Sequence, residues 1–348
     1  MKIETPSKIL ITGGQEVGGV GSFAEGLADG FAALGIPSEI IPPSRILSRW
    51  RDLRDAKVLK ILSATAVYAA PFARRVICMA HGFPRADAQG WIKFLAIISS
   101  YKLANFCSEA RLVAVSDYGA IHLRSIFNLK VDAVIHNPLK PLFLETFDRA
   151  AQHRNYITYV GRLHPVKNLH RVLPAIHDLL KETPGLRACF IGDGEQRAEL
   201  ERMVNGDPNF EFKGSLDSAG VRGWLRRTHV FVSGCETEAL GISYLEALSQ
   251  GCSVVMPACG GGLEIAPELI GTRIHLLPLS FDRNETLAAL RRAFGPKCEP
   301  VTFAAYEAKV IAQAYLSLDM YFPCMGTINY GFRKPQAGTT GVNLSGHN

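Results

Sequence analysis

Apolar runs alternate with amphipathic stretches along the first half of the chain. The run at residues 8–12 (KILIT) ends in glycines, which predicts a buried strand followed by a tight turn. A helix is predicted next, because apolar residues recur at helical spacing at Phe23, Leu27, Phe31 and Leu34. Further buried strands are predicted at residues 38–41, 74–79, 112–115 and 131–135. This half is therefore expected to be an α/β unit with a glycine-rich first turn.

The same alternation resumes after residues 138–155, whose two prolines and polar stretch predict an interdomain linker. Strands are predicted at residues 156–160, 187–191, 229–233, 252–256 and 274–278, and helices at residues 168–181, 195–204 and 241–250. Pro174 lies inside the first of these helices and is expected to kink it or end it early. The sequence therefore predicts two α/β domains with mostly parallel sheets.

Composition narrows the class of protein. The chain has 348 residues, of which 47% are hydrophobic and 20% are charged, so it has enough apolar material for two cores. A net charge of +6, from 38 basic and 32 acidic residues, is too small and too mixed to indicate nucleic-acid binding.

No stretch of the sequence approaches the roughly 20 apolar residues of a membrane span. The first residues also lack the apolar run of a signal peptide.

Cysteine usage points to a reducing compartment. Eight cysteines are scattered along the chain and none forms a Cys-x-x-Cys pair, which argues against zinc ribbons and thioredoxin-like redox sites. They are expected to be reduced, mostly buried thiols of a cytoplasmic protein.

Residues that suit a phosphorylated ligand follow two of the predicted strands, where open α/β sheets bind their ligands. The glycines of GGVG (18–21) let a phosphate approach backbone N–H groups, although a plain tight turn has the same composition. Arg162 and Lys167 flank the start of a helix within YVGRLHPVKN (159–168), where two cations suit a diphosphate. The alternative is a pair of solvated surface cations.

Acidic and imidazole side chains follow two further strands. Glu238 is expected in a loop and Glu246 in the next helix, and their spacing does not place them on one helix face. Carboxylates accept hydrogen bonds from sugar and ribose hydroxyls, whereas a solvated position is the alternative for Glu246. His81 lies just beyond the strand at residues 74–79, which suits a substrate contact. A histidine that is only hydrogen-bonded within its loop is the alternative there.

The second half resembles the retaining glycosyltransferases of family 4, the glycosyl transferases group 1. The matching stretches are GRLHPVKN (161–168), FIGDGEQRAELE (190–201), FEFKGS (210–215), ETEALGISYLEALSQG (236–251) and GGGLEIAPEL (260–269). The first half matches through GGVGSFAEGLADGF (18–31), the pair His81 and Gly82, VSDYG (115–119) and IHNP (135–138). The chain departs from the family where Gly234 and Cys235 replace Pro-Ser, where residues 239–241 (ALG) replace Gly-Phe-Gly, and where Pro138 replaces the glycine of Asn-Gly.

The resemblance implies a role for each matched residue. Gly18 and Gly19 would contact the donor diphosphate through backbone N–H groups, and Arg162 and Lys167 would clamp it. Glu246 would hold the ribose hydroxyls, while Glu238 and His81 would contact the transferred sugar. The other implied donor-binding positions are Gly192, Lys213, Gly214, Leu240, Gly241, Ile242, Gly262 and Leu263.

The resemblance also implies a fold and a reaction. The GT-B fold has two Rossmann-like α/β domains facing a cleft, here residues 1–145 and 146–302. A C-terminal helix (303–330) is expected to pack back on the first domain, before a flexible tail (331–348). The reaction would move a hexose-type sugar, with retention, from a UDP-sugar or GDP-mannose to a hydroxyl of a glycan or lipid-linked acceptor. Surface polysaccharide or glycoconjugate biosynthesis is the expected setting, and no cofactor or metal is expected, because the chain lacks an Asp-x-Asp triplet.

Residues 41–111 carry 12 Lys and Arg against 4 Asp and Glu, which bears on the acceptor. A basic cluster with apolar neighbours spans residues 45–61, and a helical pattern follows at Trp91, Phe94, Leu95 and Ile98. Such a surface suits an anionic bilayer, which makes the inner face of the cell membrane a candidate location. Two ordinary amphipathic helices are the equally weighted alternative.

Two other functions share parts of this pattern. A nucleotide-sugar epimerase of the same architecture is disfavoured by the context of Glu238 and Glu246, and product analysis without an acceptor separates it from a transferase. A catalytically silent nucleotide-sugar-binding partner is disfavoured by the presence of both glutamates together with Arg162 and Lys167. Comparing the activity of the wild type with that of Arg162→Ala decides this case.

Overall fold

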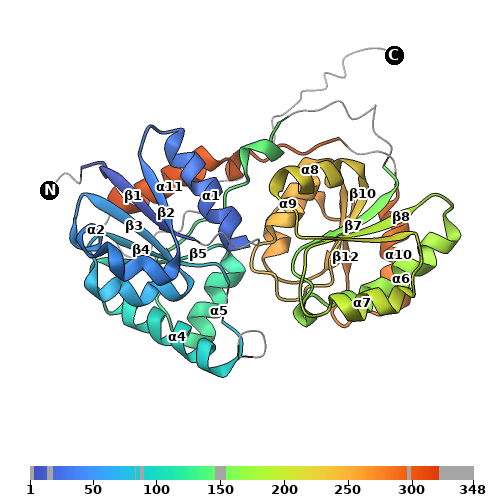
Figure 1. Cartoon of the computed structure of the whole chain (residues 1–348), viewed down its shortest axis with the longest axis horizontal. Helices are drawn as coiled ribbons and strands as arrows, with labels where there is room; N and C mark the ends of the chain where they lie inside the picture. Colours follow the sequence, from blue (N-terminus) through green and yellow to red (C-terminus); the bar gives the residue numbers. More distant parts are fainter. Residues whose placement is uncertain are drawn as a thin grey trace, which may run out of the picture.

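The protein consists of two α/β halves, each built on a six-stranded parallel sheet with helices on both faces (Figure 1). The structure is a computed structural model that describes residues 4–13, 19–82, 84–86, 90–145, 154–295 and 299–320. Gly18 and the predicted tail at residues 331–348 lie outside this part of the chain. The two sheets confirm the predicted α/β class.

The first sheet has the strand order β2-β1-β3-β4-β5-β6, with every neighbouring pair parallel. Its strands are β1 Lys8–Thr12, β2 Ser38–Ile41, β3 Val58–Ser63, β4 Val76–Ala80, β5 Ala110–Ala114 and β6 Ala133–Val134. The helices around it are α1 Gly19–Ala32, α2 Trp50–Arg54, α4 Trp91–Asn105 and α5 Asp117–Phe127, with 3-10 segments at Pro43–Arg49 and Ala64–Phe72. The inner strands are covered on both faces, which is why they appear in the sequence as nearly continuous apolar runs.

The second sheet has the order β12-β11-β10-β7-β8-β9 and is also parallel. Its strands are β7 Tyr156–Val160, β8 Arg187–Ile191, β9 Phe210–Gly214, β10 Thr228–Val232, β11 Ser253–Pro257 and β12 Ile274–Leu277. Its helices are α6 Leu169–Glu182, α7 Arg197–Val204, α8 Ser218–Arg227, α9 Ile242–Ser249 and α10 Arg283–Ala293. Helix α6 runs through Pro174 to Glu182, so the expected early end is wrong. Pro174 stands in the second turn, where the only bond lost is the one to the His170 carbonyl.

The last described helix, α11 (Ala308–Met320), returns to the first half and packs against α1. A side chain at Gly30 of α1 would place its Cβ 2.1 Å from the Ala308 carbonyl oxygen, so only glycine permits this approach. One apolar cluster includes Phe23 of α1, Tyr315 of α11 and Tyr156 of the second sheet. The two halves therefore share buried packing.

The basic segment at residues 45–61 differs from the expected amphipathic helix. It forms a 3-10 turn, the short helix α2 and the buried strand β3. Lys60 is fully buried in β3, and its ammonium donates hydrogen bonds to the carbonyls of Asp55 and Arg74 at 2.5 and 2.8 Å. Burial lowers the pKa of Lys60 to about 8. The long side chain carries its charge to the end of the strand, so a lysine fits within a buried apolar strand. Lys60 therefore contributes no positive charge to the protein surface.

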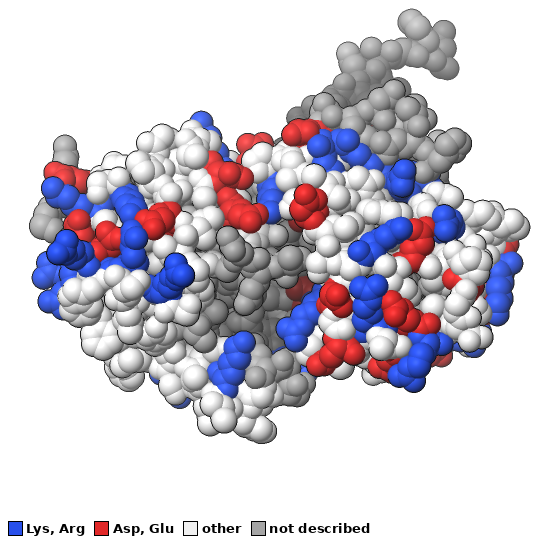
Figure 2. Space-filling view, viewed as in Figure 1, with Lys and Arg blue, Asp and Glu red and all other residues white. Residues whose placement is uncertain are grey.

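Two surface properties bear on function. Among the described residues no helix is both long and apolar enough to cross a membrane. On the face shown in Figure 2, acidic and basic side chains are interspersed both over the second half and at the outer edge of the first half. The cysteines of the described part, Cys78, Cys107, Cys189, Cys235, Cys252 and Cys259, are free thiols.

Candidate active site

A cavity of about 550 Å³ lies between the two halves, a size typical of small-molecule sites. It is bordered by segments that follow the carboxyl ends of strands in both sheets, where parallel sheets place their ligands. The first half contributes Gly21, Ser22, His81, Asn137 and Phe143. From the second half, the predicted residues that line it are Arg162, Lys167, Gly192, Glu238, Leu240, Gly241, Ile242 and Glu246.

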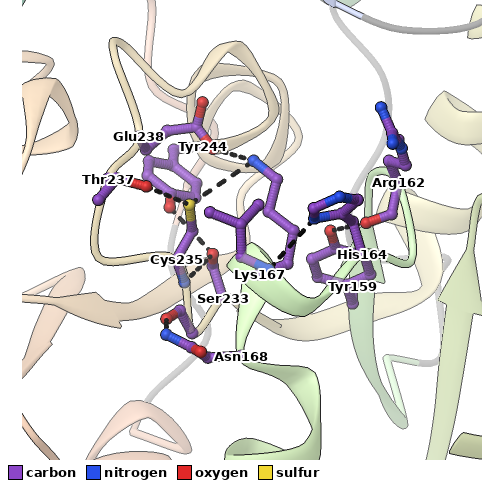
Figure 3. Close-up of polar contacts among 12 residues, drawn as sticks. Tyr159, Arg162, His164, Lys167, Asn168, Ser233, Cys235, Thr237, Glu238 and Tyr244 are labelled. Atoms are coloured by element: carbon purple, nitrogen blue, oxygen red, sulfur yellow. Dashed lines mark hydrogen bonds and ion pairs between the residues drawn. The ribbon is translucent and has the colours of Figure 1, made fainter. Parts of the chain in front are cut away.

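Lys167 and Glu238 form an ion pair of 2.6 Å at the cavity wall (Figure 3). Burial by itself would lower the pKa of Lys167, but the Glu238 carboxylate outweighs it, so this pKa lies well above its usual value. Burial by itself would raise the pKa of Glu238, but the Lys167 ammonium outweighs it, so this pKa is lowered. Both groups are therefore charged at neutral pH.

The loops that carry this pair are held by hydrogen bonds at their bases (Figure 3). Asn168, in the left-handed backbone region at φ 51°, donates from its side chain to the Gly234 carbonyl at 3.1 Å. The Tyr244 hydroxyl donates to the Ser233 hydroxyl at 3.0 Å. The buried Cys235 thiol lies 3.7 Å from the Lys167 ammonium. The segments after β7 and β10 are therefore fixed relative to each other.

Arg162 supplies a second cation at the cavity. Its side chain is solvent-exposed and is directed away from the Lys167–Glu238 pair in Figure 3. The Tyr159 hydroxyl donates to the Arg162 carbonyl at 2.9 Å, which fixes its backbone. No described acidic residue forms an ion pair with Arg162, so its guanidinium is open to an anionic ligand.

Glu246 borders the cavity from within α9. The residue is only 8% exposed, and no described residue donates a hydrogen bond to its side chain. Burial raises the pKa of Glu246 to about 8, opposed by the Lys140 ammonium. A buried carboxyl group without partners costs free energy, which ligand hydroxyls would recover. The solvated alternative considered for this glutamate is therefore wrong.

His81 follows β4 and borders the cavity from the first half. Its ring packs edge-on against Phe23, with centroids 4.4 Å apart. Both ring nitrogens are buried without a hydrogen bond of normal geometry among the described residues. Burial lowers the pKa of His81 to about 4, opposed by the Asn137 side chain, so the imidazole is neutral at physiological pH. A neutral ring with unsatisfied nitrogens is suited to bind a hydroxyl group.

Two backbone segments beside the cavity approach each other so closely that one of them needs a glycine. Gly192 follows β8 at φ 130°, and a Cβ there would lie 2.0 Å from the Gly161 carbonyl oxygen. Gly19 is the first residue of α1, and the first turn of that helix borders the cavity through Gly21 and Ser22. The first turn of α1 therefore borders the same cavity as the two cations.

Five of the described residues that were predicted to bind the donor are not among those that line the cavity: Gly19, Lys213, Gly214, Gly262 and Leu263. Lys213 pairs with Glu211, and its ammonium lies 4.8 Å from the centre of the Trp224 ring; Gly214 follows it at the end of β9. Gly262 and Leu263 belong to the 3-10 segment η5 (Gly261–Glu264), which packs behind Tyr244. Asn137, which belongs to the IHNP stretch but was given no role from the sequence, also lines the cavity and lies three residues beyond the end of β6.

No metal centre is apparent in the part of the chain that the structure describes. There, no three His, Cys, Asp or Glu side chains are grouped so that they could hold a metal ion. The cationic side chains that line the cavity are those of Arg162 and Lys167.

Known proteins resemble this chain mainly through its second half. The family described as glycosyl transferases group 1 matches residues 145–274. The sulfoquinovosyl transferase SQD2 of Arabidopsis thaliana is 37% identical over 112 residues, 32% of this chain and 21% of the relative. The phosphatidylinositol N-acetylglucosaminyltransferase gpi3 subunit of Schizosaccharomyces pombe is 30% identical over 152 residues, 42% of this chain and 33% of the relative. The matches therefore cover a third or less of the length of these two relatives.

Solved structures resemble the whole chain. The Anabaena protein HepE, determined in complex with UDP and glucose, superimposes with a TM-score of 0.64 at 16% identity, over 90% of this chain and 95% of that one. WaaG, a glycosyltransferase involved in lipopolysaccharide biosynthesis, gives a TM-score of 0.63 at 13% identity, over 92% and 96%. These likenesses establish the fold. The chain therefore has the GT-B fold, and its residues 145–274 match the family of glycosyl transferases group 1.

Proposed function

We propose that the protein is a hexosyltransferase that moves a sugar from a nucleoside-diphosphate sugar to a hydroxyl group of a glycan or lipid-linked acceptor. The observation that carries the proposal is the set of groups around one cavity: the Lys167–Glu238 pair, the open guanidinium of Arg162 and the unpartnered carboxyl group of Glu246. Cations suit the diphosphate and carboxyl groups suit the hydroxyls of ribose and hexose.

Charge stabilisation on the leaving group is the main chemical task in this proposal. Arg162, Lys167 and the N-terminus of α1 neutralise the negative charge that grows on the departing diphosphate. They do so without a divalent metal, and activity is therefore expected to survive chelation with EDTA. Glu238 binds hydroxyls of the transferred sugar, and Lys167 links it to the diphosphate side of the cavity.

In the proposed reaction, the transferred sugar retains the configuration of its anomeric carbon. The incoming hydroxyl approaches on the face that the diphosphate leaves, through an oxocarbenium-like state. The neutral imidazole of His81 borders the cavity from the opposite half and contacts the sugar next to the reacting carbon. Closure of the two halves excludes water from this space.

The acceptor side is proposed to lie on an anionic membrane surface. Helix α4 buries Ile97, Tyr101 and Ala104 and exposes a strip of large apolar side chains along its other side. The strip and its immediate extension consist of Trp91, Ile92, Leu95, Leu103 and Phe106, which are 47–88% exposed. Lys93 and Lys102 stand among them. An apolar strip flanked by lysines suits the headgroup region of a bilayer, which supports the proposal that the enzyme acts at the inner face of the cell membrane. The gpi3 relative is named for a phosphatidylinositol substrate, which also favours a lipid-linked acceptor.

The function is tested first by thermal stabilisation with UDP, GDP, ADP, UDP-glucose, UDP-N-acetylglucosamine and GDP-mannose, with EDTA present. A ligand at 100 times its dissociation constant adds about 2.7 kcal/mol, a clearly measurable shift. A shift with one base, lost in both Arg162→Ala and Glu246→Ala, identifies the donor class and the site together. The absence of a shift with every nucleotide contradicts the proposal.

Product analysis then separates the alternatives. With the stabilising donor and no acceptor, a transferase leaves the sugar nucleotide intact or hydrolyses it slowly, whereas an epimerase converts it to an isomer. A silent binding partner shows the thermal shift but no turnover with membrane extracts as acceptor. Transfer of a labelled sugar into the lipid fraction, abolished in Arg162→Ala, supports the proposed reaction.

A further inference from the structure

A carboxylate from the second half caps a helix of the first half. Glu264 accepts hydrogen bonds from the backbone N–H groups of Asp117 at 2.8 Å and Tyr118 at 2.6 Å. Both groups lie in the first turn of α5, where no carbonyl of the helix can reach them. The next N–H, from Gly119, is bound locally by the Ser116 hydroxyl at 3.0 Å. Two N–H groups in the first turn of α5 therefore bind a carboxylate from the other half.

The segment that carries Glu264 is tightly joined to the Lys167–Glu238 pair. Glu264 ends η5, and the N–H of Gly261 in the same segment donates to the Glu238 carbonyl at 2.9 Å. A Cβ at Gly261 would lie 1.7 Å from the Ala239 carbonyl oxygen, so the two backbones are in direct contact. A displacement of η5 away from the Glu238 loop would break this hydrogen bond and backbone contact. A continuous set of contacts thus runs from the ion pair to α5 of the other half.

We infer that Glu264 is a positioning residue that couples the separation of the two halves to the placement of Glu238. The inference deepens the proposed sugar transfer and depends on it for its catalytic consequence. When the halves separate, Glu264 loses two hydrogen bonds and its attraction to the N-terminus of α5. When a nucleotide orders Lys167 and Glu238, the η5 segment carries that constraint to Glu264 and holds α5 in place.

The first test is amide hydrogen exchange in the full-length, ligand-free protein. In Glu264→Gln the side chain keeps its shape but loses its charge and one of its two acceptors, so exchange at Asp117 and Tyr118 is expected to be about tenfold faster than in the wild type. Glu268→Gln, which neutralises an exposed acid four residues along, serves as the matched control and leaves both amides unchanged. Ser116→Ala is a second control: it weakens the same helix end from within the first half and accelerates mainly Gly119. Equal exchange at Asp117 and Tyr118 in Glu264→Gln and Glu268→Gln overturns the inference.

The second test asks whether nucleotide binding at the cavity changes amide exchange at the start of α5. A contact that serves only to hold the structure together would not produce such a change. Saturating UDP is expected to slow exchange at Asp117 and Tyr118 in the wild type. In Glu264→Gln, UDP is expected to bind with an affinity within threefold of wild type but to leave these amides unaffected. Slowing of equal size in both proteins overturns the coupling. If UDP and the other nucleotides do not bind, the proposed function fails, and the ligand-free exchange experiment still decides whether Glu264 holds the two halves.

Discussion

Arg75 and Asp319 lie 244 residues apart in the chain and form a bidentate ion pair in the protein interior. Arg75 Nε lies 2.9 and 3.0 Å from the two carboxylate oxygens, and Nη2 lies 2.6 Å from one of them. The Asp319 side chain is fully buried. The other guanidinium donors reach the carbonyls of Ala56 and Glu4. This pair fastens the end of α11 to the first sheet, although α11 follows the second half in the chain.

Removal of this carboxylate is expected to destabilise the protein strongly. Asp319→Ala leaves the Arg75 guanidinium buried without its counter-charge, which costs roughly 3 kcal/mol of unfolding free energy. Urea unfolding followed by circular dichroism measures the loss. Asp178→Ala, which breaks the exposed pair with Arg283, is the control and is expected to change little. Equal losses in the two variants would mean that burial of the pair is not what matters.

The two partners of the ion pair at the cavity are expected to affect different steps. Lys167→Met removes a cation that faces the diphosphate and is expected to weaken UDP binding by roughly 100-fold. Glu238→Gln is expected to leave UDP affinity within threefold, because UDP carries no sugar, and to lower kcat for sugar transfer roughly 100-fold. Isothermal titration and a transfer assay measure the two quantities.

A neighbouring ion pair provides the matched control for this experiment. Arg171 and Glu236 lie 2.7 Å apart beside the same loops but do not line the cavity. Arg171→Met and Glu236→Gln are expected to change stability without a selective effect on either UDP binding or transfer. A loss of UDP affinity in Arg171→Met as large as that in Lys167→Met would contradict the assignment of the diphosphate site.

Nucleotide affinity is expected to rise with pH because of Glu246. Its pKa of about 8 in the ligand-free protein means that the carboxyl group is mainly protonated at pH 6.5 and mainly ionised at pH 8.5. Ribose hydroxyls that donate to the anion favour ionisation, so UDP binding is expected to be about tenfold weaker at pH 6.5 than at pH 8.5. Glu246→Gln is expected to bind weakly at both values and to lose this dependence. A pH dependence that persists in the variant would assign it to another group.

The raised pKa of Glu246 also predicts the direction in which the stability of the protein changes with pH. The folded pKa of Glu246 is above its unfolded value, so its contribution is favourable at low pH and is lost as pH rises from about 4.5 through 8. Glu246→Gln is therefore expected to melt a few degrees higher than wild type at pH 8.5 and at nearly the same temperature at pH 5. Differential scanning calorimetry without ligand tests this prediction.

Membrane binding is expected to depend on the exposed strip of α4. The wild type is expected to sediment with vesicles of phosphatidylglycerol at low salt and much less with phosphatidylcholine. Leu95→Glu combined with Leu103→Glu is expected to abolish sedimentation while nucleotide-induced stabilisation persists. Leu279→Glu, at a position 62% exposed in the second half, serves as the control and is expected to sediment like the wild type. A wild type that ignores anionic vesicles rules out this surface as a membrane site.

Much of the secondary structure follows from local pattern. The strands at residues 8–12, 156–160 and 187–191 occupy the predicted ranges. Strands buried on both faces need apolar residues at every position, which makes them visible in a single sequence. Two strands were missed for the converse reason: Lys60 interrupts the apolar run of β3, and the outer strand β9 has the mixed sequence FEFKG.

The candidate residues could be found from their position after strands and from family motifs. Their ion pairing, burial and pKa values, however, depend on the fold. The sequence shows that Glu238 and Lys167 are close to strand ends, and only the structure shows that they neutralise each other at 2.6 Å. Similarly, Glu246 is an ordinary helix position in the sequence. Its depth, and therefore its pKa, is set by side chains from both halves that surround the cavity.

The sequence by itself determined the α/β class, the two-domain order and the position of most chemical groups, because each of these depends on patterns within about 20 residues. The tertiary structure alone decided which distant groups meet. Arg75 reaches Asp319, Lys60 is buried, and Glu264 caps α5 of the other half. Such contacts join residues whose separation along the chain carries no local signal, since they arise only when all helices and strands pack together.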